Sequence, residues 1–269
     1  MRILLTNDDG IDAEGLNALA RRLADWADLS VVAPDAERSA SGHSITLKRP
    51  LVAEPRRLDA VDQAWAIGGT PADCVKLALE VLLPQFPDLV ISGINHGSNL
   101  GRDVFYSGTV SAAIEASFLG VPALAVSLTR PNSAGLAWGA GFVRWWLEHA
   151  FVFPPSGVIY NLNLPEYVGT PPTQLVPASL GRRVYRNQFR LETTVDGRRA
   201  WWLGGEPLVE DEAPDSDVAV VARGQIALTP IRLEVTADDV LHTMEPMSFR
   251  IAPERPAILP KRGGGAHRA

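Results

Sequence analysis

Short runs that are apolar throughout alternate with stretches of helical periodicity over the first half of this chain. Residues 3–6 form such a run, and runs of this kind are typical of strands that a parallel sheet buries on both faces. Over residues 14–26 the apolar positions instead recur every three to four residues, which predicts a helix with one apolar face. This alternation predicts an α/β fold with a doubly wound, mostly parallel sheet.

The same pattern continues to about residue 162. It predicts further core strands at 29–33, 89–91, 123–128 and 158–162, the last of which closes the core. It predicts further helices at 70–83, 109–119 and 136–151. Thr70 marks one helix start, because it can cap the helix while Pro71 and Asp73 suit the first turn. Shorter extended pieces are expected at 44–48, 51–54 and 63–67, and a long loop at 93–107.

The sequence changes character after residue 165. Asp196-Gly197 is a strong turn signal between extended stretches at 190–195 and 199–203, which predicts a β-hairpin. Further extended segments are expected at 218–222 and 225–228. We therefore predict three parts: a Rossmann-like catalytic core over 1–165, a β-rich extension with oligomer contacts over 166–252 that packs on the core, and a disordered tail over 253–269.

Composition excludes some functions and favours a reducing compartment. A formal charge of −6 argues against duplex nucleic acid as the main partner, since duplex binders show a basic face. The single cysteine, Cys74, cannot form an intrachain disulfide and is expected to be a small buried apolar residue. We find neither a signal-peptide pattern nor an apolar run of about 20 residues, so we expect a cytoplasmic protein without membrane contact.

Two adjacent carboxylates, Asp8 and Asp9, follow the first predicted strand directly. In parallel sheets, ligands bind beyond the carboxyl ends of the strands. Adjacent carboxylates repel each other, and a hard cation such as Mg²⁺ or Mn²⁺ offsets that repulsion with oxygen ligands. The alternative is that the pair caps the next helix or forms a turn with Gly10, and position alone leaves both interpretations open.

Two more predicted strands end in polar loops that would reach the same edge of the sheet. The loop after the second strand carries Ser39, and the loop after the third core strand carries Asn95. A hydroxyl and an amide oxygen would complete a hard-ion set with the two aspartates, and water and a substrate phosphate would fill the remaining positions. Either loop alone is equally consistent with a solvated turn.

The helix predicted after residue 107 is a candidate phosphate site. It begins Ser107-Gly108-Thr109 and carries no acidic residue before Glu115. Its first backbone N–H groups and its dipole suit an anion, and the glycine permits close approach. Simple N-capping by Ser107 or Thr109 is the alternative. Ser39 and Asn99 are further candidate phosphate contacts.

Two histidines lie in the same polar loops. His43 and His96 could donate protons or contact phosphate, or they could be ordinary loop residues.

Four segments in this order resemble the stationary-phase survival protein SurE family of nucleotidases. They cover about the first 120 residues and lie at 5–11 with Gly15 following, at 33–41, at 92–101 and at 106–113. The resemblance implies a Rossmann-like core with a β-hairpin extension and a dimer or tetramer. It implies one divalent metal ion per subunit, Mg²⁺ or Mn²⁺, bound by the residues matching Asp8, Asp9, Ser39 and Asn95. It also implies hydrolysis of 5′- and 3′-nucleoside monophosphates, and in some members of short polyphosphate.

A mechanism follows from this assignment. The ion would neutralise the phosphate and lower the pKa of a water that attacks phosphorus. Asp8 or Asp9 would orient that water, while Asn95, Asn99 and the helix start at residues 107–109 would hold the phosphoryl oxygens. A covalent aspartyl-phosphate and a non-catalytic metal- or nucleotide-binding module remain alternatives. A Gly-x-Gly-x-x-Gly motif after a strand and a P-loop are both missing from the sequence.

Overall fold

The computed structural model describes residues 1–59, 61, 63–208 and 212–248. Residues 1–234 form one compact unit, and the described residues 235–248 belong to a second. Within the second unit, the described residues 235–248 contain one short helix, α6 (Asp238–Leu241). No helix in the described part of the chain is long and apolar enough to cross a membrane.

Nine strands of the described first unit form one sheet, which confirms the predicted α/β class. In spatial order they are β3 (Ala53–Pro55), β4 (Gln63–Ile67), β2 (Asp28–Pro34), β1 (Arg2–Thr6), β5 (Leu89–His96), β6 (Ala123–Leu128), β7 (Val158–Leu164), β11 (Ile226–Arg232) and β8 (Leu175–Pro177). From β4 to β7 all neighbours are parallel. Strand β3 is antiparallel to β4 and β11 is antiparallel to β7.

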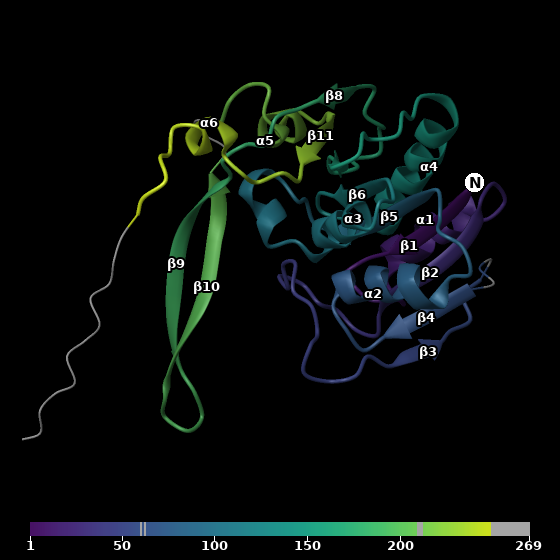
Figure 1. Cartoon of the computed structure of the whole chain (residues 1–269), viewed down its shortest axis with the longest axis horizontal. Coiled ribbons are helices and arrows are strands. Elements are labelled where there is room, and N and C mark those ends of the chain that lie inside the picture. The colour runs from purple at the N-terminus through teal and green to yellow at the C-terminus, as the bar shows by residue number, and fades with distance from the viewer. Residues whose placement is uncertain (60, 62, 209–211, 249–269) are drawn as a thin grey trace, which may run out of the picture. The chain divides into compact units, whose positions relative to one another are not determined.

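Helices cover both faces of this sheet (Figure 1). They are α1 (Glu14–Leu23), α2 (Pro71–Leu77), α3 (Gly108–Phe118), α4 (Ser133–His149) and α5 (Asp217–Ala222). Because side chains alternate along a strand, Ile3 and Leu5 join the core under α1 and α4, whereas Leu4 joins the core under α2 and α3. Burial on both faces explains the continuously apolar strand sequences.

The predicted helix start at Thr70 is confirmed. The Thr70 hydroxyl accepts a hydrogen bond from the Asp73 backbone N–H at 3.1 Å, and the Asp73 carboxylate accepts one from the Thr70 N–H at 2.9 Å. A π-helical turn, Ala78–Leu82, continues α2 to about the predicted end. Cys74 is buried in the core under α2 and α3, and burial raises the pKa of its thiol, as expected of a packing residue.

Three predictions about secondary structure are wrong. The long loop expected at 93–107 is shorter, because β5 continues to His96 by pairing with β6 and a 3₁₀ helix occupies Gly101–Phe105. Residues 218–222 are helical rather than extended. Their valines favour strands, but the Ser216 side chain caps α5 and three valines of this helix are buried. Residues 44–48 join no strand, because the Thr46 N–H donates to the Asp73 carboxylate instead.

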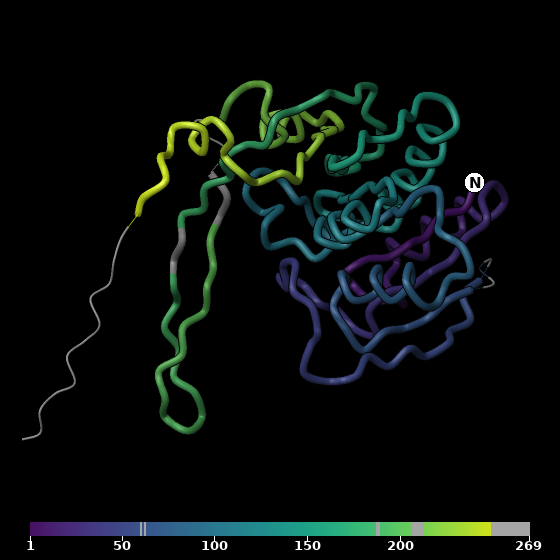
Figure 2. The backbone as a smooth tube through the Cα atoms, in the orientation of Figure 1, coloured from purple at the N-terminus to yellow at the C-terminus, as the bar shows by residue number. Residues whose placement is uncertain are grey.

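The predicted last core strand, β7, is not the edge of the sheet. Strands β11 and β8 extend it beyond the predicted domain boundary at residue 165, and both lie in the first compact unit. The backbone trace shows the chain leaving this sheet after β8 and returning to form β11 (Figure 2). The division into a catalytic core and an extension with oligomer contacts stays a prediction. The predicted disordered tail, residues 253–269, lies outside the described residues.

The predicted hairpin is present between β8 and β11. It consists of β9 (Val184–Thr193) and β10 (Arg199–Leu208), which pair only with each other in the described sheets. Gly197 in the turn has a φ of +81°, a conformation that favours glycine. Both strands are longer than the sequence pattern predicts.

Candidate active site

Asp8 lies at the carboxyl end of β1, in direct contact with the start of α3. The residue is 4% exposed, and its carboxylate accepts a hydrogen bond from the Thr109 hydroxyl. A Cβ atom on Gly108 would lie 2.7 Å from the Asp8 Cβ and 2.8 Å from its Oδ2, so only glycine permits this approach. The structure thus brings together two features 100 residues apart in the sequence: the predicted acidic pair and the predicted phosphate site.

The buried position of Asp8 affects its ionisation. Burial raises the pKa of Asp8 from 3.8 to about 6. The hydrogen bond from Thr109 lowers this pKa, and the neighbouring charge of Asp9 raises it. The carboxylate therefore carries a charge for which solvent provides little compensation, and a bound cation would favour its ionised form.

Asp9 connects the end of β1 to the end of β5. Its Oδ2 accepts a hydrogen bond from the His96 backbone N–H at 3.1 Å. Burial raises the pKa of Asp9, the His96 hydrogen bond opposes this shift, and the nearby charge of Glu37 adds to it. Three carboxylates therefore share this edge of the sheet. His96 contributes its backbone N–H here, whereas the sequence suggested its side chain.

Ser39 is exposed, and its hydroxyl donates to Glu37 Oε1 at 2.6 Å. The preceding Arg38 donates its backbone N–H to the Asp8 carbonyl at 2.7 Å, which holds the loop against β1. The structure thus places the loop that follows β2 at the predicted edge.

Asn95 is near the end of β5 and only partly buried. Its side-chain Nδ2 donates to the Gly97 carbonyl at 2.8 Å, which leaves its Oδ1 as the atom available to a ligand.

Two glycines let neighbouring backbone approach the end of β5. A Cβ on Gly15 would lie 2.0 Å from the Ile94 carbonyl oxygen, and one on Gly93 would lie 2.2 Å from that of Val126.

Asn99 is buried and already hydrogen-bonded within the protein. Its side-chain nitrogen donates to the Ser127 hydroxyl at 2.9 Å, and its carbonyl accepts from the amides of Asn161 and Asn163 at 2.8 and 3.0 Å. This network ties the loop after β5 to β6 and β7. The sequence analysis missed Asn161 and Asn163, although two asparagines inside an apolar strand were a readable signal.

Ser107 caps α3, and the cap is compatible with anion binding. Its side chain accepts from the Val110 N–H at 3.1 Å, and its carbonyl accepts from the Ser111 N–H and hydroxyl. The Gly108 N–H has no acceptor within the described residues, whereas the Thr109 N–H contributes a hydrogen bond to the Asp8 carboxylate. Capping therefore uses the third amide of the helix and leaves the Gly108 amide for a ligand.

His43 lies away from the acidic pair. Its Nε2 is 2.8 Å from Glu115 Oε2, and its ring stacks on Phe118, so it packs on the surface of α3. The structure therefore does not place it where a proton donor to the acidic pair would lie.

The donor set at this edge fits a hard divalent cation. Zinc is commonly held by three or more His, Cys, Asp or Glu side chains, and the described residues contain no such group. Mg²⁺ is often bound through one or two carboxylates together with waters and substrate oxygens, and Mn²⁺ accepts similar ligands. Asp8 and Asp9 supply such a pair. The adjacent Asn7 Oδ1 is buried without a hydrogen-bond partner in the described structure.

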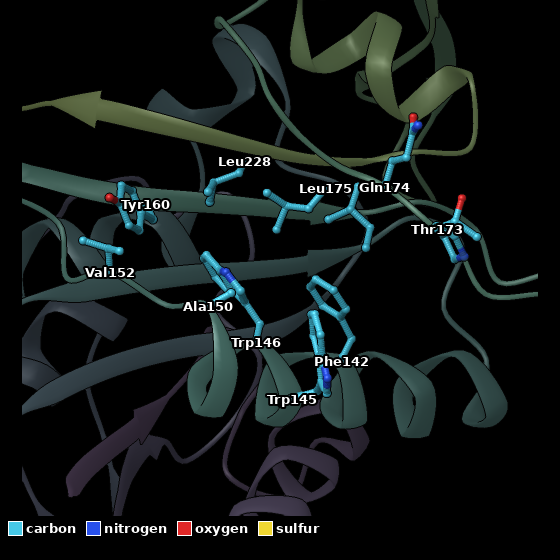
Figure 3. A pocket seen from close by; sticks show the side chains of 12 residues that line it. Phe142, Trp145, Trp146, Ala150, Val152, Tyr160, Thr173, Gln174, Leu175 and Leu228 are labelled. Carbon is cyan, nitrogen blue, oxygen red and sulfur yellow. The ribbon is translucent and has the colours of Figure 1, made fainter.

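A separate cavity of about 620 Å³ lies between α4 and strands β7, β8 and β11 (Figure 3). Aromatic side chains from α4 and aliphatic ones from the strands line it, together with Tyr160, Thr173 and Gln174. Its lining contains no charged side chain, so it lacks the groups that would hold a phosphate dianion. None of the predicted site residues contributes to it.

Fold and site together define a class: a doubly wound α/β protein with a polar site beyond the carboxyl ends of its parallel strands. The sequence model of the family described as "Survival protein SurE" matches residues 3–187. This chain belongs to the SurE family.

Relatives and a solved structure agree over most of the chain. The "5'-nucleotidase SurE" of Pelotomaculum thermopropionicum is 44% identical over 247 residues, which is 91% of this chain and 94% of the relative. That of Heliobacterium modesticaldum is 46% identical over 241 residues, 88% of each. The crystal structure of the SurE protein from Aquifex aeolicus superimposes with a TM-score of 0.74 at 33% identity, covering 91% of this chain and 98% of that one.

Proposed function

We propose that this chain is a divalent-metal-dependent phosphomonoesterase that hydrolyses nucleoside 5′-monophosphates, and 3′-monophosphates, to nucleoside and phosphate. Its relatives are named 5′-nucleotidases. The observation that carries the proposal is the contact of the buried Asp8 carboxylate with Gly108 and Thr109 at the start of α3. Carboxylates and a helix N-terminus at one point suit a cation and a phosphate together.

Four side chains would hold the ion, one per subunit: Asp8, Asp9, Ser39 and Asn95. To take this role, Ser39 exchanges its hydrogen bond with Glu37 for the new ligand. A bound Mg²⁺ or Mn²⁺ supplies charge neutralisation and a more acidic water.

The other roles belong to the chain itself. The N-terminus of α3, where the Gly108 N–H is free, binds the phosphoryl oxygens, and the α3 dipole favours their charge. Asp8 or Asp9 orients the attacking water and accepts its proton. Asn99, whose side-chain nitrogen is bonded to Ser127, holds the loop after β5 in place.

Electrostatics make metal dependence a strict requirement of this proposal. Asp8, Asp9 and Glu37 all place negative charge at the sheet edge, and this charge adds to the effect of burial, which is the main cause of the raised pKa of both aspartates. A phosphate dianion would be repelled from this edge without a compensating cation. We therefore expect substrate turnover to cease when divalent ions are removed.

The test is phosphate release from a panel of 5′- and 3′-nucleoside monophosphates and an aryl phosphate, with Mg²⁺, with Mn²⁺ and with chelator. Metal-dependent release that is strongest for nucleotides supports the proposal. Release from the aryl phosphate alone contradicts the nucleotide assignment. Nucleotide binding without release under any condition identifies a non-catalytic binding module instead.

A matched pair of variants tests the acidic pair. Asp9→Asn should abolish metal-dependent release while the fold remains intact. Asp12→Asn, an exposed aspartate three residues further on, should leave release unchanged. Full activity in folded Asp9→Asn would refute the role of Asp9 in holding the ion.

The hairpin supports a homodimer or homotetramer. Strand pairing places Leu203 opposite Phe189 and Trp201 opposite Leu191 on one face of the ribbon, and each of these four side chains is at least two-fifths exposed. A two-stranded ribbon with an apolar face is marginally stable unless that face is covered. We expect Trp201→Lys to shift the sedimentation coefficient towards a smaller species. An unchanged sedimentation profile would exclude this face from subunit contacts.

We also place the protein in the cytoplasm. Cys74 is the single cysteine, and it is buried and free. The chain therefore gains no disulfide from an oxidising compartment. Cell fractionation followed by immunodetection would test this location.

A further inference from the structure

Arg183, at the base of the hairpin, binds the segment that connects the two halves of the candidate site. Its Nε lies 2.6 Å from Asp103 Oδ2, and its Nη1 donates to Ser98 Oγ at 3.0 Å. The Tyr185 hydroxyl donates to the same Asp103 oxygen, and the guanidinium lies 5.8 Å from the Tyr185 ring centroid. The arginine side chain is only 14% exposed. Charge-assisted contacts at such a shielded position are stronger than those at the surface.

The backbone around Arg183 is held independently of its side chain. Arg183 has a φ of +44°, an unfavourable value for a residue other than glycine, and its N–H donates to Glu212 Oε1 at 2.6 Å. The buried Asp217 carboxylate accepts from the N–H groups of Gly101 and Gly181, each at 2.9 Å. Glu212 thus fixes the turn at 181–183, and Asp217 joins this turn to the segment after β5.

The segment held in this way, residues 97–107, joins both parts of the proposed site. Ser98 follows Asn95 by three residues. Asp103 precedes Ser107 by four residues, and its carbonyl accepts the Ser107 N–H at 3.1 Å. One guanidinium therefore bridges the part of the segment next to Asn95 and the part that leads into α3.

We propose that Arg183 is a positioning residue for phosphoryl transfer: it fixes the placement of Asn95 relative to the N-terminus of α3. The proposal rests on the proposed nucleotidase function. Arg183 acts through Ser98 and Asp103. Its planar guanidinium makes both contacts at once, which a lysine ammonium cannot reproduce in the same geometry.

The first experiment compares kcat and KM for a nucleoside monophosphate across variants. A misplacement of about 1 Å in a catalytic arrangement can lower the rate roughly 100-fold. We expect Arg183→Ala to lower kcat by about tenfold or more, with a smaller change in KM, and Arg183→Lys to recover part of that loss. The adjacent Arg182, whose side chain is exposed, provides the matched control, and Arg182→Ala should retain wild-type kcat.

A double-mutant cycle separates positioning from general destabilisation. Ser98→Ala removes the acceptor of the Arg183 Nη1 hydrogen bond and leaves Arg183 itself unchanged. It is a conservative change, so it tests the contact even if Arg183→Ala fails to fold. If the contact positions the loop, the two substitutions together should cost no more in kcat than Arg183→Ala alone. Additive losses, or kcat within twofold of wild type in folded Arg183→Ala, would overturn the proposal.

Hydrogen exchange provides a readout that does not depend on turnover. Backbone amides in residues 97–107 should exchange faster in Arg183→Ala than in Arg182→Ala, while those of the central strands remain unchanged. Unchanged exchange in this segment refutes the positioning role even if the wild-type protein is active. A wild-type protein that releases no phosphate but shows the faster exchange refutes the nucleotidase proposal and leaves the contact of Arg183 with the loop supported.

Discussion

Gly108→Ala tests most directly whether Asp8 and α3 work as a unit. The added Cβ would lie 2.7 Å from the Asp8 Cβ, 2.8 Å from its Oδ2 and 3.0 Å from the Pro71 Cγ. Carbon atoms in ordinary contact are about 3.5–4.0 Å apart. The start of α3 must therefore move by about 1 Å away from β1, because the backbone of the buried strand has little freedom to yield.

The size of the effect follows from that displacement. A shift of about 1 Å in a catalytic arrangement can cost roughly 100-fold in rate, which corresponds to about 2.7 kcal/mol of transition-state stabilisation. Crowding in a packed core also destabilises the fold, typically by about 1–3 kcal/mol. We expect kcat to fall by about 100-fold and the unfolding free energy to fall by about 1–3 kcal/mol.

The assay is metal-dependent phosphate release, with urea unfolding of the same preparations. Gly141→Ala is the matched control, because Gly141 lies within α4 and its nearest neighbour would be 3.9 Å from the new Cβ. This change should leave kcat unchanged and stabilise the helix by about 0.5–1 kcal/mol. A folded Gly108→Ala variant with kcat within twofold of wild type would refute the proposed role of this contact.

Two further predictions concern the ionisation of Asp8, and a third concerns the cap of α2. Because the folded pKa of Asp8, about 6, exceeds its ordinary value of 3.8, the folded state binds the proton more tightly. Protonation of Asp8 thus contributes stability that is fully present below about pH 4 and is lost as pH rises through 6. With a chelator present, the unfolding free energy should fall by about 3 kcal/mol over this range. Urea unfolding at a series of pH values should show that Asp8→Asn removes this pH dependence of the unfolding free energy. A plot of unfolding free energy against pH that runs parallel to that of the wild type would contradict the prediction. Thr109→Val should raise the pKa of Asp8 further, because the hydrogen bond that it removes favours the ionised carboxylate. The unfolding free energy should therefore fall by about 1.5–3 kcal/mol at pH 8 and by less at pH 4. Equal decreases at the two pH values would contradict this explanation. Thr70→Ala should cost about 1 kcal/mol through loss of the α2 cap without changing kcat, as thermal unfolding and activity together would show.

Local sequence predicted most of the fold up to residue 165. Buried strands, amphipathic helices and the Thr70 cap depend on residues within a few positions of each other, so periodicity and capping are visible without a structure. The same logic predicted the hairpin from Asp196 and Gly197. It failed at α5, because the burial of its valines overrides their preference for strands.

Local sequence also predicted the chemistry of the candidate site, since adjacent carboxylates after a buried strand indicate a ligand site whatever follows. It could not predict which partners meet there. Thr109 reaches Asp8 from 101 residues away, and Asn163 reaches the Asn99 backbone from 64 residues away. Arg183 reaches Ser98 from 85 residues away, from the turn before β9, in a region that the sequence assigned to the β-rich extension. Secondary structure and ligand chemistry were determined by near neighbours, whereas contacts between distant segments arose only when the sheet order and helix packing placed them together.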